Sequence, residues 1–327
     1  MLRYIKLTLS ATALLLTSAC SQNELQGEVT VLRLGHTLDT QHSVHKAMEY
    51  LGERLDYYSD GTMSVVIYPS SQLGTEREMV ELLQIGSLAM TKVSASPLEG
   101  FAPEMKIFSI PYIFRDNEHF WRVLNSDLGD ELLSGVGDFR LKGLGYYDAG
   151  SRSFYTNDKP IETPSDLNGL KIRVLNSPTA VATVRALGGA ATPVAWGELY
   201  TALQQGVVDG AENNPPSYYL SRHYEIARYY SLDEHTSVPD VMLASLPVWE
   251  SLNEQQRTWL TKAMEDSVEY QRELWKTSTQ ASLEKVKAEG VTVITPDKAP
   301  FVEAVKPFHK SFENTPIGDL ITQIKAM

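Results

Sequence analysis

The sequence is poor in cysteine and in positive charge, and each shortage excludes a class of protein. One cysteine among 327 residues rules out a disulfide framework or a multi-thiolate metal site within the chain. Lysine and arginine total 29 against 41 aspartate and glutamate, for a net charge of −12. This charge would repel phosphate backbones, so we expect no nucleic-acid partner. A hydrophobic content of 43% with 21% charged residues is typical of a globular protein and excludes a disordered chain or a bundle of membrane spans.

The first 20 residues carry the pattern of a secretory signal peptide. Arg3 and Lys6 precede an apolar stretch over 7–16, and small residues precede Cys20. An apolar run of about ten residues is too short to cross a hydrocarbon core of about 30 Å as a helix. Two interpretations of the cleavage site stay open. Cys20 is either the acylated cysteine of a bacterial lipobox or lies beside an ordinary signal-peptidase site.

Signatures of catalysis and of metal binding are missing. The sequence has no G-x-S-x-G elbow, no H-E-x-x-H pair and no P-loop. His42 and His45 lie three positions apart on a predicted helix, but no neighbouring carboxylate or third histidine completes a metal site. We expect these two histidines to lie on a solvated helix face, and we expect no metal and no cofactor.

Hydrophobic periodicity alternates between β and α along the chain, whose length suits two domains. Strands are predicted over 29–34 and 64–68, with a helix over 44–55 between them. Thr75 and Glu78 form a capping box that opens the next helix. A second cycle starts near residue 150. Units of this kind predict an α/β fold with a parallel sheet covered by helices on both faces.

One long helix is predicted over 253–289. This region has no proline between Pro247 and Pro296, and no glycine between Gly210 and Gly290. A helix of roughly 35 residues rises about 50 Å, which exceeds the width of one small domain. We therefore expect it to run across both lobes.

Two arginines indicate an anion site in an acidic protein. Arg152 lies in the segment 150–153, at the expected junction between lobes. Arg173 lies on a strand over 170–174 that should end at the crevice. Two guanidinium groups facing one cleft would bind a carboxylate. The alternative from the pattern alone is that each arginine pairs with a structural acid.

Four segments together resemble the substrate-binding proteins of TRAP transporters, the DctP-type periplasmic solute receptors: 69–74, 109–112, 170–174 and 198–213. The resemblance implies a two-lobed fold like that of periplasmic binding proteins, with a ligand cleft between the lobes and the long helix spanning both. It assigns 27–149 plus 239–278 to lobe I and 150–238 plus 279–327 to lobe II.

The same resemblance implies a function. The protein would be a monomeric periplasmic receptor, free or lipid-anchored through Cys20, that closes on a small carboxylated solute. It would deliver that solute to the small and large membrane subunits of the transporter. We therefore expect a binding protein and not an enzyme.

Roles for individual residues follow in part from the resemblance. It places the salt bridge to the ligand carboxylate on Arg173, with Arg152 and Asn213 as further contacts. Other candidates lie at strand ends, at a helix start or beside the hinge, and for each of them a structural role is the alternative: His36, Glu76, Lys92, Asp148, Trp196, Asn214 and His235.

The segments 86–94, 146–156 and 213–217 resemble the sugar-acid branch of the family, in particular receptors for hexuronates such as D-glucuronate and D-galacturonate. Acids and amides among the candidates would serve hydroxyl groups and repel a second carboxylate. An aldonate, a diketogulonate or a C4-dicarboxylate are alternative ligands. A periplasmic lyase with His36 or His235 as its base is the alternative from another class.

Overall fold

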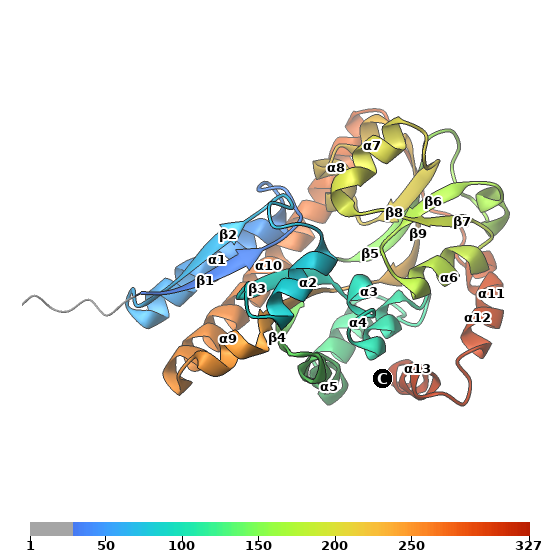
Figure 1. The fold of residues 1–327 in the computed structure, drawn as a ribbon. Helices are drawn as coiled ribbons and strands as arrows, with labels where there is room; N and C mark the ends of the chain where they lie inside the picture. The colour runs from blue at the N-terminus through green and yellow to red at the C-terminus, as the bar shows by residue number, and fades with distance from the viewer. Residues whose placement is uncertain (1–28) are drawn as a thin grey trace, which may run out of the picture.

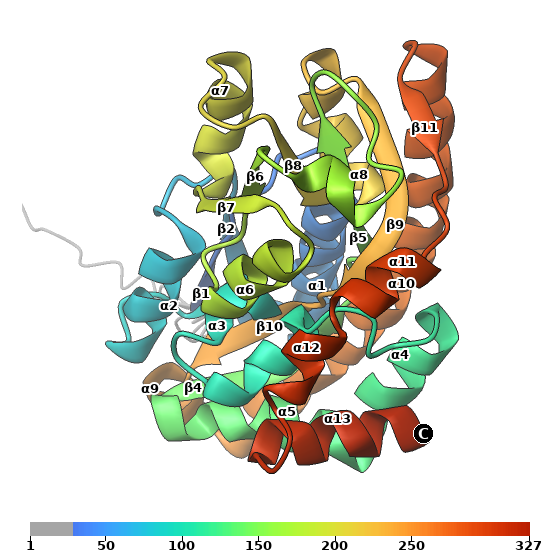
Figure 2. The same ribbon diagram turned by 90° about the vertical axis from the view of Figure 1, so that its right-hand side faces the viewer.

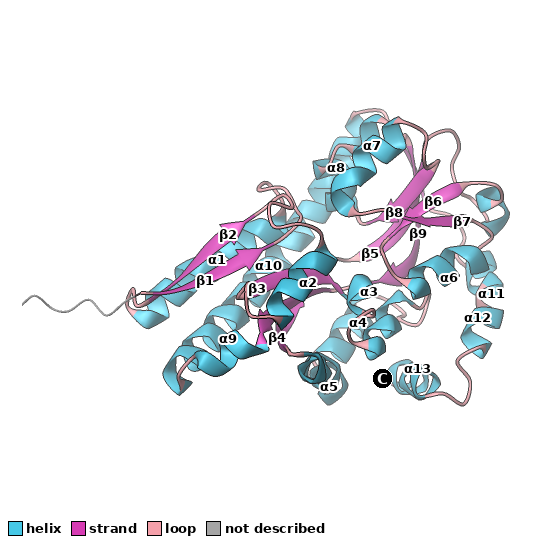
Figure 3. Ribbon diagram, in the orientation of Figure 1, coloured by secondary structure: helices cyan, strands magenta, loops and turns pink. Residues whose placement is uncertain are grey.

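The computed structural model describes residues 29–327. The predicted signal peptide and Cys20 lie outside these residues. Two β-sheets, each flanked by helices, form the two lobes of an α/β protein (Figures 1 and 3). This architecture confirms the predicted fold class.

The sheet of the first lobe has the strand order β2-β1-β3-β10-β4. β1 is parallel to β2 and β3, as the alternating pattern predicts, whereas β10 is antiparallel to both β3 and β4. The prediction of a parallel sheet is wrong for β10 because this strand enters from the other lobe and runs in the opposite direction. The strands are β1 (Thr30–Gly35), β2 (Met63–Tyr68), β3 (Met90–Ser94), β4 (Leu141–Tyr147) and β10 (Asp240–Ser245).

The sheet of the second lobe has the order β11-β9-β5-β8-β6-β7 and is also mixed. β6 is parallel to β7 and β8, while β5 is antiparallel to β8 and β9. The chain passes between the sheets after β4 and again after β9. The strands are β5 (Ser151–Thr156), β6 (Lys171–Val174), β7 (Ala190–Pro193), β8 (Gly210–Asn213), β9 (Tyr229–Ser237) and β11 (Thr292–Ile294).

Helices cover the sheets, and the longest of them joins the lobes. α10 spans 35 residues between its caps Asn253 and Glu289, which confirms the predicted long helix. Leu260 and Met264 pack in the core of the first lobe and Val286 packs in that of the second. The helices are α1 (Ser43–Ser59), α2 (Glu76–Gln84), α3 (Ala95–Leu98), α4 (Asn117–Leu124), α5 (Asp127–Gly135), α6 (Pro178–Ala186), α7 (Leu199–Gln204), α8 (Pro215–Leu220), α9 (Leu246–Ser251), α10 (Glu254–Ala288), α11 (Ala299–Ala304), α12 (Lys306–Lys310) and α13 (Pro316–Ala326).

Short 3-10 helices connect several of these elements. They are η1 (Pro103–Ser109), η2 (Val136–Phe139), η3 (Pro164–Leu167), η4 (Trp196–Glu198) and η5 (His223–Glu225). No helix within 29–327 is both long enough and apolar enough to cross a membrane.

The C-terminal helix α13 packs on the first lobe. Ile321 and Ile324 belong to the hydrophobic core of the first lobe, and Nε2 of His119 lies 2.9 Å from the carbonyl oxygen of Ile324. Figure 2 shows the chain leaving α11 and α12 to reach α13 below them. This packing departs from the assignment of 279–327 to lobe II, because the apolar face of α13 completes the other core. The remaining lobe boundaries stay predictions.

Candidate functional site

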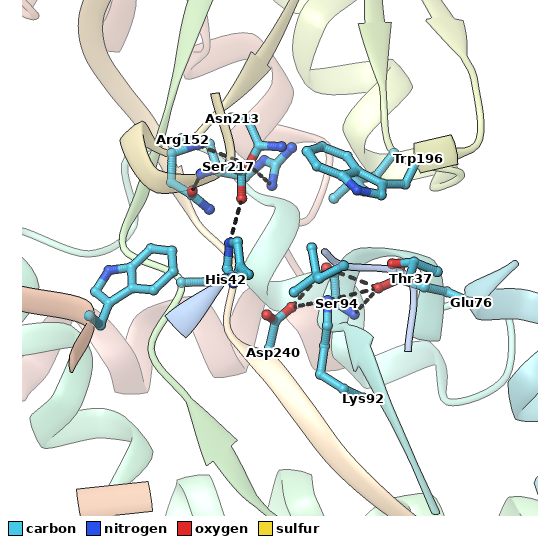
Figure 4. Close-up of a pocket in the computed structure, with 15 residues that line it drawn as sticks. Thr37, His42, Glu76, Lys92, Ser94, Arg152, Trp196, Asn213, Ser217 and Asp240 are labelled. Atoms are coloured by element: carbon cyan, nitrogen blue, oxygen red, sulfur yellow. Dashed lines mark hydrogen bonds and ion pairs between the residues drawn. The ribbon is translucent and has the colours of Figure 1, made fainter. Parts of the chain in front are cut away.

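A cavity lined mainly by polar side chains lies between the two lobes. We call it the inner cavity. Figure 4 shows Arg152, Asn213 and Trp196 of the second lobe facing Lys92 and Asp240 of the first. The strand ends that carry these side chains meet at the crevice, as expected for α/β lobes. An adjoining outer cavity shares Thr37, Glu76, Leu175 and Trp196 with it and is lined by Arg173.

Arg152 on β5 is almost fully occupied by partners from its own lobe. Its Nη2 donates to Oε1 and to the carbonyl oxygen of Glu212, at 2.9 Å and 2.8 Å, and its Nε donates to Oε2 of the same residue. Its Nη1 donates to Oδ1 of Asn213 at 3.0 Å. Burial alone would raise the pKa of Glu212, but the charge of Arg152 and hydrogen bonds from His235 and Arg152 lower it to about 2. The pair is therefore fully ionised.

Arg173 on β6 has the opposite character. Its side chain is 1% exposed, and its Nε donates to the carbonyl oxygen of Val194 at 2.9 Å. Its buried Nη1 has no hydrogen-bond partner, and no carboxylate within residues 29–327 forms an ion pair with it. Burial lowers the pKa of Arg173, because the guanidinium is held away from water without a paired acid. The cleft thus contains a buried cation that still needs an anion.

The first lobe supplies the floor of the inner cavity. Nζ of Lys92 on β3 lies 2.9 Å from Oδ1 of Asp240 and 3.0 Å from Oε1 of Glu76. The Thr75–Glu78 capping box fixes the start of α2, through Thr75 N to Oε2 of Glu78 at 2.7 Å and Glu78 N to Oγ1 of Thr75 at 3.3 Å. This cap places Glu76 at the cleft.

Two asparagines and a tryptophan complete the wall of the second lobe. Oδ1 of Asn213 accepts from Arg152 and from the backbone N of Asn214, so its Nδ2 protons remain to donate. Asn214 caps α8 by accepting from the backbone N of Ser217 at 2.9 Å. Trp196 lines both cavities. The centroid of its ring lies 5.8 Å from Cζ of Arg173.

His42 bridges the lobes across the inner cavity. Its Nδ1 accepts from the backbone N of Val44 at 3.2 Å, which places the imidazole proton on Nε2. Nε2 lies 3.4 Å from Oγ of Ser217, as Figure 4 shows. Burial and the charge of Lys92 lower the pKa of His42 to about 3. The expectation of a solvated face is wrong for His42 and His45, because the start of α1 points into the protein and buries both.

Three predicted site residues lie outside both cavities: His36, Asp148 and His235. His36 is buried, with Nδ1 accepting from Leu38 N at 3.1 Å and Nε2 2.9 Å from Nδ1 of His45. Asp148 accepts from Nε1 of Trp121 at 3.0 Å, beside the chain crossing. Neither side chain faces the space where a ligand would lie.

His235 lies behind Arg152, between two acids. Its Nδ1 is 2.8 Å from Oδ2 of Asp233 and its Nε2 is 3.7 Å from Oε2 of Glu212. Burial alone would lower the pKa of His235, but these two carboxylates raise it to about 9. The imidazole is therefore a cation that supports the wall of the cavity.

Several cavity residues are absent from the sequence-based candidates: Thr37, His42, Ser94, Ser217, Asp240 and Trp275. Asp240 lies next to the lobe boundary expected at 239, and this position beside the junction between lobes could have indicated a cleft residue. Trp275 sits within α10, where the apolar stripe of a helix does not distinguish a core residue from a cavity residue. No group of three or more His, Cys, Asp or Glu within 29–327 has the arrangement of a metal site.

Comparisons with known proteins agree on one family. Residues 34–315 match the family described as bacterial extracellular solute-binding protein, family 7 (DctP). The protein named YiiZ of Salmonella typhimurium is 39% identical over 289 residues, which cover 88% of each chain. The chain is also similar to the solved TRAP periplasmic solute binding protein of Xanthobacter autotrophicus with bound β-D-galacturonate. That structure is 40% identical, with a TM-score of 0.87, over 90% of this chain and 99% of that one. A TRAP protein of Anaerococcus prevotii with bound D-glucuronate is 37% identical, with a TM-score of 0.87, over 91% and 98% of the two chains.

Proposed function

Since the chain belongs to the family 7 extracellular solute-binding proteins of the DctP type, we propose that it is the receptor of a TRAP transporter and that its ligand is a hexuronate. The receptor closes its two lobes on D-galacturonate or D-glucuronate. It then delivers the sugar acid to the membrane subunits of the transporter. It works as a monomer in the periplasm, free or anchored through Cys20.

The unpaired buried guanidinium of Arg173 carries this proposal. A buried cation without a counter-charge is unfavourable, and a ligand carboxylate that accepts from its Nη groups would relieve that cost. Arg152 has one of its five N–H donors left after its bonds to Glu212 and Asn213. It therefore adds positive potential and at most one further hydrogen bond.

The other cavity groups suit the hydroxyls of a sugar. The carboxylates of Glu76 and Asp240 and the amide groups of Asn213 and Asn214 line the inner cavity, and carboxylate oxygens and amide protons are partners for hydroxyl groups. The ring of Trp196 offers an apolar surface against which a sugar ring can pack. The bound galacturonate and glucuronate of the two similar structures support the choice of a hexuronate over the other sugar acids.

The two histidines named for the lyase alternative are not placed to act as its base. His36 uses both ring nitrogens within its own lobe, and the raised pKa of His235 keeps it protonated at neutral pH. Neither imidazole has a free lone pair directed into the cavity. A binding role without chemistry therefore fits these residues better.

The test is calorimetric titration of the purified mature protein with galacturonate, glucuronate, galactose, glucose and succinate. Tight binding of either uronate, with no binding of the neutral sugars, is expected because an uncharged sugar leaves Arg173 unpaired. Succinate binding more tightly than both uronates would replace the hexuronate with a C4-dicarboxylate. Mass spectrometry of the uronate after hours with the protein should return it unchanged, and conversion to a product would instead support the lyase.

A further inference from the structure

The floor of the inner cavity holds three charged side chains that do not neutralise one another completely. Burial alone would lower the pKa of Lys92, but the charges of Asp240 and Glu76 raise it, so the ammonium stays charged. Two carboxylates around one ammonium leave one net negative charge. Asp240 and Lys92 are both buried, so solvent screens this charge poorly.

Each of the two carboxylates keeps one oxygen for a ligand. Lys92 and Ser94 both contact Oε1 of Glu76, with Ser94 N at 3.1 Å. The same two residues contact Oδ1 of Asp240, with Ser94 Oγ at 2.9 Å. In the described part of the chain, Oε2 of Glu76 and Oδ2 of Asp240 receive no hydrogen bond. Ionised carboxylate oxygens accept and never donate, so these positions call for hydroxyl donors.

The two lobes therefore give the cleft walls of opposite charge: Arg173 lines the outer cavity, Asp240 lines the inner cavity, and Glu76 lines both. Arg173 presents its unpartnered, buried Nη1 on the side of the second lobe. Glu76 and Asp240 present free acceptor oxygens on the side of the first lobe. A ligand with one carboxylate and hydroxyls at its far end matches both walls, whereas a ligand with a carboxylate at each end would bring one of them against the acids.

We propose that Glu76 and Asp240, with Lys92 held between them, form a specificity filter that binds hydroxyls and rejects a second carboxylate. The receptor accordingly accepts monocarboxylated sugars and excludes aldarates, the sugar acids with carboxylates at both ends. This inference rests on the proposed function and assigns the part of the site that reads the far end of the ligand.

The experiment compares galactonate with galactarate, acyclic acids that differ only in a terminal CH₂OH or carboxylate, with galacturonate as the reference. Calorimetry on the wild type should give at least 100-fold weaker binding of galactarate than of galactonate. Asp240→Asn should narrow this gap at least tenfold, because the floor becomes neutral. The double variant Glu76→Gln/Asp240→Asn should narrow it further, because the charge of Lys92 is then unopposed.

Glu53→Gln is the matched control, since Glu53 is an exposed acid on α1 of the same lobe and its loss should leave the ratio unchanged. Wild-type protein that binds galactarate within tenfold of galactonate would overturn the filter. Galactonate bound as poorly as galactarate would also overturn it, because the open chain would then be the rejected feature. A folded Asp240→Asn protein with an unchanged ratio of galactarate to galactonate affinity would also overturn the filter. If Asp240→Asn does not fold, the same ratio measured in the wild type and in Glu76→Gln provides the test. A wild-type protein that does not bind galacturonate would instead contradict the proposed function.

Discussion

The guanidinium Cζ of Arg173 lies 5.8 Å from the ring centroid of Trp196, so the cation is held against an aromatic face while its Nη1 stays unpaired. Such an arrangement fixes the direction of the Nη donors before any ligand arrives. Arg152 differs because Glu212 already takes both its Nε and its Nη2. The two arginines of the cleft should therefore respond differently to substitution.

Arg173→Met should abolish uronate binding but leave the free energy of unfolding of the unliganded protein within about 1 kcal/mol of wild type, or above it. An unsatisfied buried donor costs roughly 1–3 kcal/mol, which the substitution removes. Arg173→Lys should weaken binding at least 100-fold, because an ammonium cannot form the planar two-point contact. Urea unfolding and calorimetry measure both effects. Arg152→Met is the control, with an expected loss of about 3–5 kcal/mol because buried Glu212 loses its closest cation and keeps only His235, 3.7 Å away. Equal losses of stability in both variants would contradict the distinction.

The secondary structure was largely predictable from the sequence, because it depends on local signals. The Thr75–Glu78 capping box, the glycine-free and proline-free region over 253–289 and the strand over 170–174 are each signals contained within one segment. The structure bears them out as α2, α10 and β6. Strand direction was less accessible, since β10 pairs with strands about 100 or more positions away in sequence.

The site was predictable where a residue's role depends on its own strand, and less so where it depends on distant partners. Lys92 lines the inner cavity, but its ion pair with Asp240 joins residues 148 positions apart, and no local pattern indicates such a pair. His42 illustrates the reverse error: a spacing typical of a solvated face is buried here because the N-terminus of α1 meets Ser217 of the other lobe. The exact contacts of Asn213, Asn214 and Trp196 with a ligand stay predictions.

Gly150→Ala should destabilise the protein by about 1–2 kcal/mol. Gly150 has a φ of +57°, and an added Cβ would lie 3.1 Å from Nε1 of Trp275, so the substitution combines left-handed strain with a close contact at the crossing between lobes. Gly137→Ala is the control, because an added Cβ there meets no atom within 4 Å, and its effect should stay within about 0.5 kcal/mol. Urea unfolding of the two variants and of the wild type measures both effects. An equally stable Gly150→Ala protein would show that the crossing relaxes freely.

Stability should pass through a maximum near pH 6.5 and fall on both sides. Burial lowers the pKa of His36, His42 and His223 from 6.5 to about 3. Below pH 6.5 the unfolded chain therefore binds protons that the folded protein does not. Each imidazole then lowers the free energy of unfolding by about 1.4 kcal/mol for each pH unit below 6.5. The three together lower it by about 4 kcal/mol per unit, until the pKa of the folded state is reached.

Above pH 6.5 the free energy of unfolding falls as the pH rises, and His235 is the dominant group. His235 keeps its proton up to a pKa of about 9 when folded, so stability is full below pH 6.5 and falls by about 1.4 kcal/mol per unit from there to pH 9. Urea unfolding at steps between pH 4.5 and 9 measures both limbs. His223→Gln should reduce the acid slope by about one third and leave the alkaline limb unchanged, while His235→Gln should flatten only the alkaline limb. An alkaline limb that survives in the His235→Gln protein would assign it to other groups and would remove the charged imidazole from behind Arg152.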